Sequence, residues 1–123
     1  MTQRGIVLFA HGSRDPLWHR PMQAVAERIA QRAPQVAVQC AYLEWTEPSL
    51  AQAADALIAA GVTQLTVVPL FLGVGKHARE DLPVLLNHLR QAHPDVTVRC
   101  QPAVGEQAAL LDLLADLALS PEA

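Results

Sequence analysis

The chain has 123 residues, the length of one ordinary domain and too few for two. We therefore expect a single domain over residues 1–123, with residues 120–123 as a flexible tail. Hydrophobic residues make up 51% of the chain but aromatic residues only 4%, so Ala, Leu and Val must form most of the core. The formal net charge of −3 argues against a general nucleic-acid-binding protein.

The sequence also argues against a membrane protein and against a disulfide-linked one. The longest apolar stretch, residues 65–74, is interrupted by Pro69 and is far shorter than the ~20 residues of a membrane span. The first residues lead directly into a strand-like run without signal-peptide architecture, so we expect a cytoplasmic location. Cys40 and Cys100 are too few for a disulfide framework, and we expect them to be small buried hydrophobic residues.

Strand and helix patterns alternate along the whole chain. Apolar runs predict strands at residues 5–10, 35–43, 64–70 and 96–101. The first helix is expected to begin near Arg20, after a looser turn, because Pro21 cannot lie deep inside a helix. The other helices are expected between residues 46–49 and Gly61, between residues 81–83 and Pro94, and over residues 110–117.

This alternation predicts an α/β fold, a doubly wound four-stranded parallel sheet with helices on both faces. In a sheet of this size we expect the strand order 2-1-3-4. The winding then reverses between the first and third strands, and ligands bind in the crevice beyond their carboxyl ends. His11 follows the first strand and His77 follows the third, so both histidines are predicted to lie at this crevice.

The predicted crevice also receives a carboxylate, because the second strand lies beside the first and leads into Glu44 and Glu47. Two imidazoles and one of these carboxylates form a suitable ligand set for a divalent transition metal. His77 lies close to the start of the third helix, where the positive end of the helix dipole favours a neutral imidazole. A neutral imidazole is the form that accepts a metal ion or a proton.

Glycines and cations surround the two histidines. Gly12 and Gly75 allow their loops to bend sharply and let a large ligand approach the backbone. The only lysine of this acidic chain, Lys76, lies here together with two arginines, which predicts a positive rim for an anionic ligand. The predicted binding rim consists of Ser13, Arg14, Gly75, Lys76 and Arg79, with His19 nearby.

Three strings, AHGSRDP after the first strand, LEWTEPSL after the second and VVPLFLGVGKHAREDLP after the third, are specific enough to suggest a family. From about Gly5 to Leu117 the chain resembles the short CbiX/SirB-type sirohydrochlorin chelatases, single-domain class II chelatases. The resemblance implies insertion of Co²⁺ or Fe²⁺ into sirohydrochlorin, a carboxylate-rich tetrapyrrole, on the way to cobalamin or sirohaem. The metal is then a substrate, and no organic cofactor is expected.

The resemblance also assigns roles to residues. It implies that His11, His77 and Glu44 are both the metal ligands and the catalytic residues, and that two copies of the chain pair as a homodimer around the active site. Many members have two glycines before the second histidine, whereas here Gly75 is followed by Lys76, which leaves the local loop contacts open. The choice between cobalt and iron is also open, since both ions accept such ligands.

Other classes of function remain to be compared with this one. A non-catalytic metal-binding or tetrapyrrole-carrier protein would use the same residues without turnover. A histidine phosphatase needs an arginine before its histidine, and Ala10 stands there. A nucleotide-binding loop is excluded because residues 73–77 lack its spacing and its Ser or Thr.

Overall fold

The computed structural model describes residues 3–121 and contains one sheet of four parallel strands. The strands are β1 (Arg4–Ala10), β2 (Ala37–Tyr42), β3 (Gln64–Pro69) and β4 (Thr97–Cys100), in the order β2-β1-β3-β4. The helical elements are η1 (Pro16–His19), α1 (Arg20–Arg32), α2 (Leu50–Ala59), α3 (Lys76–Ala92), η2 (Val104–Glu106) and α4 (Ala108–Leu119). The predicted α/β class and strand order are confirmed. Part of the predicted tail, residues 122–123, lies outside the described residues.

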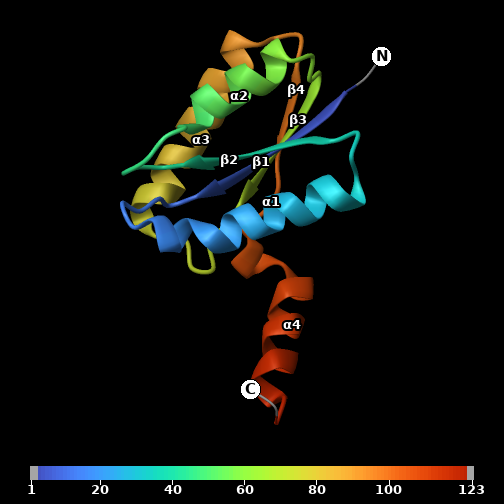
Figure 1. Cartoon of the computed structure of the whole chain (residues 1–123). Helices are drawn as coiled ribbons and strands as arrows, with labels where there is room; N and C mark the ends of the chain where they lie inside the picture. The colour runs from blue at the N-terminus through green and yellow to red at the C-terminus, as the bar shows by residue number, and fades with distance from the viewer. Residues whose placement is uncertain (1–2, 122–123) are drawn as a thin grey trace.

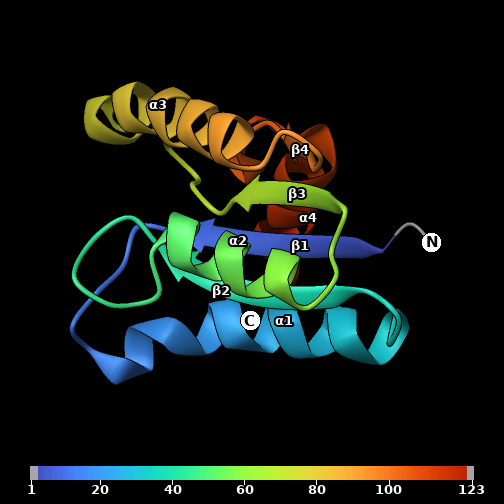
Figure 2. The ribbon, with the colours of Figure 1, turned by 90° about the horizontal axis from the view of Figure 1, so that it is seen from above.

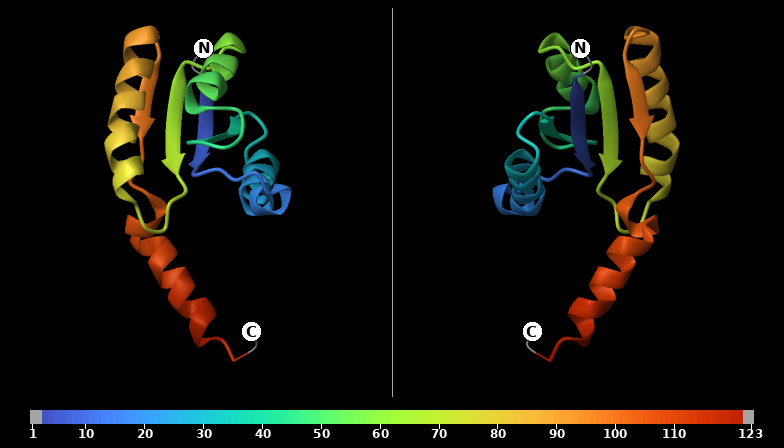
Figure 3. Two further views of the ribbon diagram at one scale, coloured as in Figure 1. Left: turned by 90° about the vertical axis from the view of Figure 1, so that its left-hand side faces the viewer. Right: turned by 90° about the vertical axis from the view of Figure 1, so that its right-hand side faces the viewer.

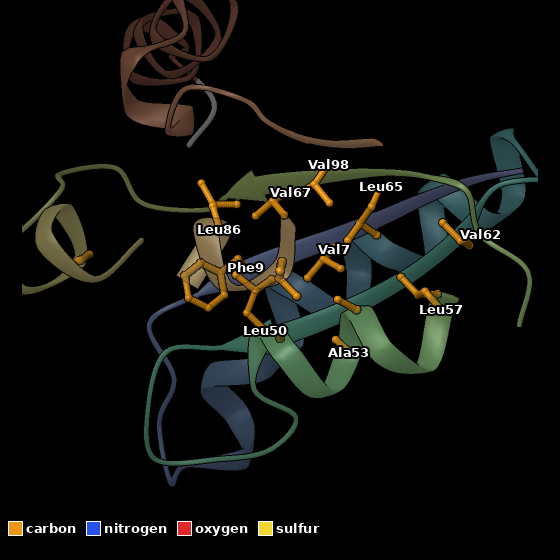
Figure 4. Close-up of a cluster of buried hydrophobic side chains, with 14 of the residues drawn as sticks. Val7, Phe9, Leu50, Ala53, Leu57, Val62, Leu65, Val67, Leu86 and Val98 are labelled. Carbon is orange, nitrogen blue, oxygen red and sulfur yellow. The ribbon is translucent and has the colours of Figure 1, made fainter. Parts of the chain in front are cut away.

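The hydrophobic core lies between the sheet and the two helices α2 and α3 (Figure 4). Alternate residues of the central strands, such as Val7 and Phe9 of β1 and Val67 of β3, point to this face and are fully buried. The Phe9 ring meets Phe71 edge to face, with 5.9 Å between ring centroids. Each such side chain stabilises the fold by about 1.5–3 kcal/mol through its removal from water.

The opposite face of the sheet is covered only in part. Helix α1 packs against β2 and β1 on this side, yet none of its residues is buried (Figures 1 and 2). Helix α4 does not cover the remaining strands, because it projects beyond the sheet (Figures 1 and 3). It contacts chiefly η2, the short turn before it, and it has no buried residue. The α1 side of β3 and β4 is therefore left uncovered by helices.

Two expectations about local structure need correction. Helix α3 begins at Lys76 rather than near residues 81–83, and Pro83 lies inside it. Pro83 has no amide hydrogen to donate to the Arg79 carbonyl, so the helix continues past it with one backbone hydrogen bond fewer, while the turn before it is closed by the Arg79 amide, which donates to the Gly75 carbonyl at 3.0 Å. The two cysteines are free thiols, as expected, but both are half-buried rather than buried.

The helices in the described part of the chain are all too short or too polar to span a membrane. The expectation for α1 is confirmed, since the helix begins at Arg20 after the turn η1. Helix α2 begins where predicted, because the Ser49 hydroxyl accepts a hydrogen bond from the Gln52 amide while the Gln52 side chain accepts one from the Ser49 amide.

Candidate functional site

Three segments lie on the same edge of the sheet, beyond the carboxyl ends of the central strands: the loop after β1, the loop after β2 and the start of α3 (Figure 2). The first two loops are joined by backbone hydrogen bonds that continue the sheet past its strands. The Leu43 amide donates to the Ala10 carbonyl at 2.9 Å, and the Glu44 amide donates to the His11 carbonyl at 3.0 Å. These bonds place the two loops side by side.

Gly12 makes this close approach possible. Its φ of +106° lies in a region that residues with a side chain rarely adopt, and its missing Cβ would collide with the carbonyl oxygen of Glu44. The sharp bend predicted at Gly12 is therefore present. At Gly75 no such demand exists, because its φ of −68° is ordinary and nothing lies near its missing Cβ.

The pairing of the loops brings His11 and Glu44 together. The Nε2 atom of His11 lies 2.8 Å from Oε1 of Glu44, and the His11 side chain is 49% exposed. Because an ionised carboxylate only accepts hydrogen bonds, a neutral His11 carries its proton on Nε2. Its Nδ1 lone pair is then free to accept a metal ion or a proton.

His77 has a carboxylate partner of its own, which the sequence analysis missed. The Nε2 atom of His77 lies 2.6 Å from Oδ2 of Asp81, one helical turn later in α3. The spacing of four residues is the signal that could have revealed this pair. This spacing did not lead to a prediction, because the helix was expected to begin only near Asp81, after His77.

The predicted ligands His11, Glu44 and His77 are not assembled into one cluster. Among residues 3–121, no group of three or more His, Cys, Asp or Glu side chains converges on a single metal position. The structure shows instead two separate imidazole–carboxylate pairs on the same edge of the sheet. Of the two carboxylates that the sequence offered, Glu44 is the one bonded to His11.

The residues of the predicted rim have different environments. Lys76 is largely exposed and lies 3.9 Å from Glu80, whereas the Arg79 guanidinium donates to the Val74 carbonyl at 3.2 Å and so closes its own loop. The Ser13 hydroxyl accepts a hydrogen bond from the Asp15 amide at 3.0 Å. The Arg14 guanidinium lies over the indole of Trp45, 4.6 Å from the ring centroid. All three cations of the rim are exposed, and Arg79 differs from the other two in that its guanidinium is bonded to its own loop.

His19 and Tyr42 support the loop that carries His11. His19 Nε2 lies 2.7 Å from the Ser13 carbonyl oxygen, and its ring meets Tyr42 edge to face at 4.7 Å between centroids. Tyr42 is 6% exposed. Burial, assisted by the neighbouring Cys40, raises the pKa of Tyr42 to about 12. The phenol therefore stays protonated at neutral pH and acts as a packing group.

Comparison with solved structures first defines the class of protein. The chain shares its fold with the sirohydrochlorin chelatase SirB of Bacillus subtilis subspecies spizizenii, solved with cobalt, at a TM-score of 0.75 and 23% identity over 95% of this chain and 52% of that one. A cobalamin biosynthesis CbiX protein of Marinobacter aquaeolei VT8 is more similar, with a TM-score of 0.78 and 36% identity over 94% of this chain and 93% of that one.

The sequence then identifies the family. The CbiX family model matches residues 5–120, so the chain belongs to the CbiX family, as its motifs indicated. The sirohydrochlorin cobaltochelatase of Methanosarcina acetivorans is 35% identical over 88 residues, which are 71% of this chain and 68% of the relative. That of Sulfolobus acidocaldarius is 29% identical over 96% of this chain and 94% of the relative.

The role of Gly12 can be tested by substitution. We expect Gly12→Ala to lower the free energy of unfolding by about 2 kcal/mol or more, because it adds both backbone strain and a collision with Glu44. Urea unfolding measures this change. Gly73→Ala is the matched control, since its Cβ meets open space, and it should change stability by less than about 0.5 kcal/mol. Equal effects of the two substitutions would contradict the packing described here.

The titration of Tyr42 provides a second test. Tyr42 is the only tyrosine of the chain, so tyrosinate absorbance reports on it alone. We expect a midpoint at about pH 12 in the folded protein and at about pH 10 in urea. Between these values the folded chain keeps a proton that the unfolded chain has lost, so stability should fall as the pH rises through this window. A folded-state midpoint near 10 would show that the ring is solvated.

Proposed function

We propose that this protein is a sirohydrochlorin chelatase, a lyase that inserts a divalent metal ion, Co²⁺ or Fe²⁺, into the tetrapyrrole. The observation that carries the proposal is the presence of two imidazoles, each bonded to its own carboxylate, on one edge of the sheet in a chain of the CbiX family. The names of the relatives support the substrate, and the structure of SirB with cobalt supports the metal.

The chemistry of metallation suits these pairs. The macrocycle must lose two pyrrole protons while the metal ion exchanges water for pyrrole nitrogens. In our proposal His11 and His77 hold the incoming metal ion through their free Nδ1 atoms and then accept the released protons. As each imidazole becomes cationic, its hydrogen bond to Glu44 or Asp81 becomes charge-assisted and stronger. The carboxylates thus act as positioning groups behind the histidines.

The rim completes this proposal. Arg14 and Lys76 lie beside the two histidines and carry the positive charge that a carboxylate-rich substrate requires. Ser13 and Gly75 border the same loops, and Arg79 holds the loop before α3 in shape. The metal ion enters as a substrate, and the proposal includes no organic cofactor. We place the reaction in the cytoplasm and in a single-domain chain.

Metal insertion by the purified protein tests the proposal. Anaerobic incubation with sirohydrochlorin and either Co²⁺ or Fe²⁺ should change the tetrapyrrole absorbance. We expect His11→Ala and His77→Ala to slow insertion by about 100-fold or more, and Glu44→Gln to slow it less. His88→Ala, an exposed histidine of α3, is the matched control and should retain the parental rate. Tetrapyrrole binding without insertion would indicate a carrier and overturn the proposal.

We also propose that the protein is a homodimer in which α4 of each copy covers the sheet of the other. Helix α4 exposes leucines along its length; Leu113 is 53% exposed and Leu117 is 61% exposed. Its direction is fixed at its base, because the Gly105 amide donates to the Phe71 carbonyl at 3.0 Å and Gly105 has no room for a side chain against the Leu72 backbone.

The uncovered face of β3 and β4 has the complementary character. Leu65, Val67 and Val98 point into the core, so Val68 and Arg99 point to the uncovered face. Arg99 lines a depression there together with Arg4 at the start of β1. Helix α4 carries Asp112 and Asp116 and no basic residue. The two carboxylates of α4 therefore complement the two arginines on the uncovered face of a second copy.

Sedimentation tests this assembly. The parent should sediment as a dimer, and the double substitution Leu113→Asp with Leu117→Asp should weaken association by at least about 100-fold, because each buried leucine contributes about 1.5–3 kcal/mol. Val84→Asp, which changes an exposed residue of α3, is the control and should remain dimeric. A parent that is monomeric at micromolar concentration would contradict the proposed exchange of helices.

A further inference from the structure

The loop between β2 and α2 presents a large aromatic side chain to solvent at an energetic cost. Trp45 is 56% exposed and has a φ of +74°, in the left-handed region that bulky residues seldom adopt. An exposed indole in a strained backbone contributes nothing to the hydrophobic core. Neither the fold nor the imidazole–carboxylate pairs account for this residue.

The Trp45 indole is already stacked against a cation. The Arg14 guanidinium lies 4.6 Å from the ring centroid, so the indole holds the arginine near one face through a cation–π contact. The two side chains line a shallow, open depression together with Gly12 and Ser13. This depression combines a flat apolar surface with a positive group, a combination that suits a flat, conjugated molecule bearing carboxylates.

The position of the pair relative to the proposed metal-handling residues is fixed by the backbone. Trp45 directly follows Glu44, and Arg14 lies three positions after His11. The bond from the Glu44 amide to the His11 carbonyl and the tight packing of Gly12 make these two loops one unit. The depression lined by Gly12 and Trp45 therefore borders the positions that carry His11 and Glu44, where the periphery of a macrocycle would lie if its centre faced His11.

We propose that Trp45 is a platform on which the tetrapyrrole stacks and that Arg14, held on the indole, binds one of its peripheral carboxylates. This inference rests on the proposed chelatase function and assigns a substrate-binding role to Trp45, which lies in the string LEWTEPSL but had no role assigned to it from the sequence. Stacking of the indole on the flat macrocycle buries apolar surface and so contributes favourably to the free energy of binding. The guanidinium binds a carboxylate through two parallel hydrogen bonds, which fixes the rotation of the macrocycle over His11.

Binding of metal-free sirohydrochlorin, followed by its absorbance, tests the platform in the full-length chain. We expect Trp45→Leu to raise the Kd for the tetrapyrrole about tenfold, whereas Trp45→Phe stays within about threefold of the parent. Arg14→Ala should raise the Kd, while Arg28→Ala, an exposed arginine of α1, should not. The affinity for Co²⁺ in the absence of tetrapyrrole, the unfolding midpoint and the sedimentation behaviour should remain parental in all four variants.

The results separate the platform from the function. If the parent inserts metal and Trp45→Leu binds tetrapyrrole as tightly as the parent does, the platform is wrong and the chelatase function stands. If Trp45→Leu changes sedimentation and leaves the Kd unchanged, the indole belongs to an interface between copies, which also overturns the platform. If the parent binds no tetrapyrrole, the proposed function and the platform fail together.

Discussion

The candidate site depends on the close contact between the loop after β1 and the loop after β2. Parallel strands place these loops on one edge, but they would remain separate if the backbone at Gly12 could not pass against the Glu44 carbonyl. The hydrogen bonds from Leu43 and Glu44 then continue the sheet by two residues beyond its strands. The His11–Glu44 pair and the Arg14–Trp45 stack each join these two loops and so depend on this contact, while His19 supports the first loop through the Ser13 carbonyl.

Much of this arrangement could be predicted because it depends on periodicity and topology. The apolar runs identified the strands, the alternation with helices predicted their order, and the order brought His11 and His77 to the same edge. Strand position alone left Glu44 and Glu47 as alternatives, and the resemblance to the family favoured Glu44. The choice between them depends on the hydrogen bond from the Glu44 amide to the His11 carbonyl, a contact between two loops that no local pattern encodes.

The parts that could not be predicted have identifiable physical causes. Pro83 obscured the start of α3, and the pairing of His77 with Asp81 was missed with it, although the turn before the proline is closed by Arg79. The leucines of α4 correctly predicted the helix, but their spacing indicates only that one face is apolar and is expected to pack against another surface. The spacing does not indicate whether that surface belongs to the same chain. In the structure, the backbone contact at Gly105 sets the direction of α4.

The contact at Gly105 joins two parts of the molecule that have been described separately. Leu72, against which Gly105 packs, belongs to the segment that connects β3 to the first turn of α3, a few residues before His77. The segment against which the base of α4 packs is thus also the loop that precedes His77. In the proposed dimer, a force that the second copy exerts on α4 would be transmitted through this segment to the loop before His77, and assembly would then be coupled to the geometry of the site.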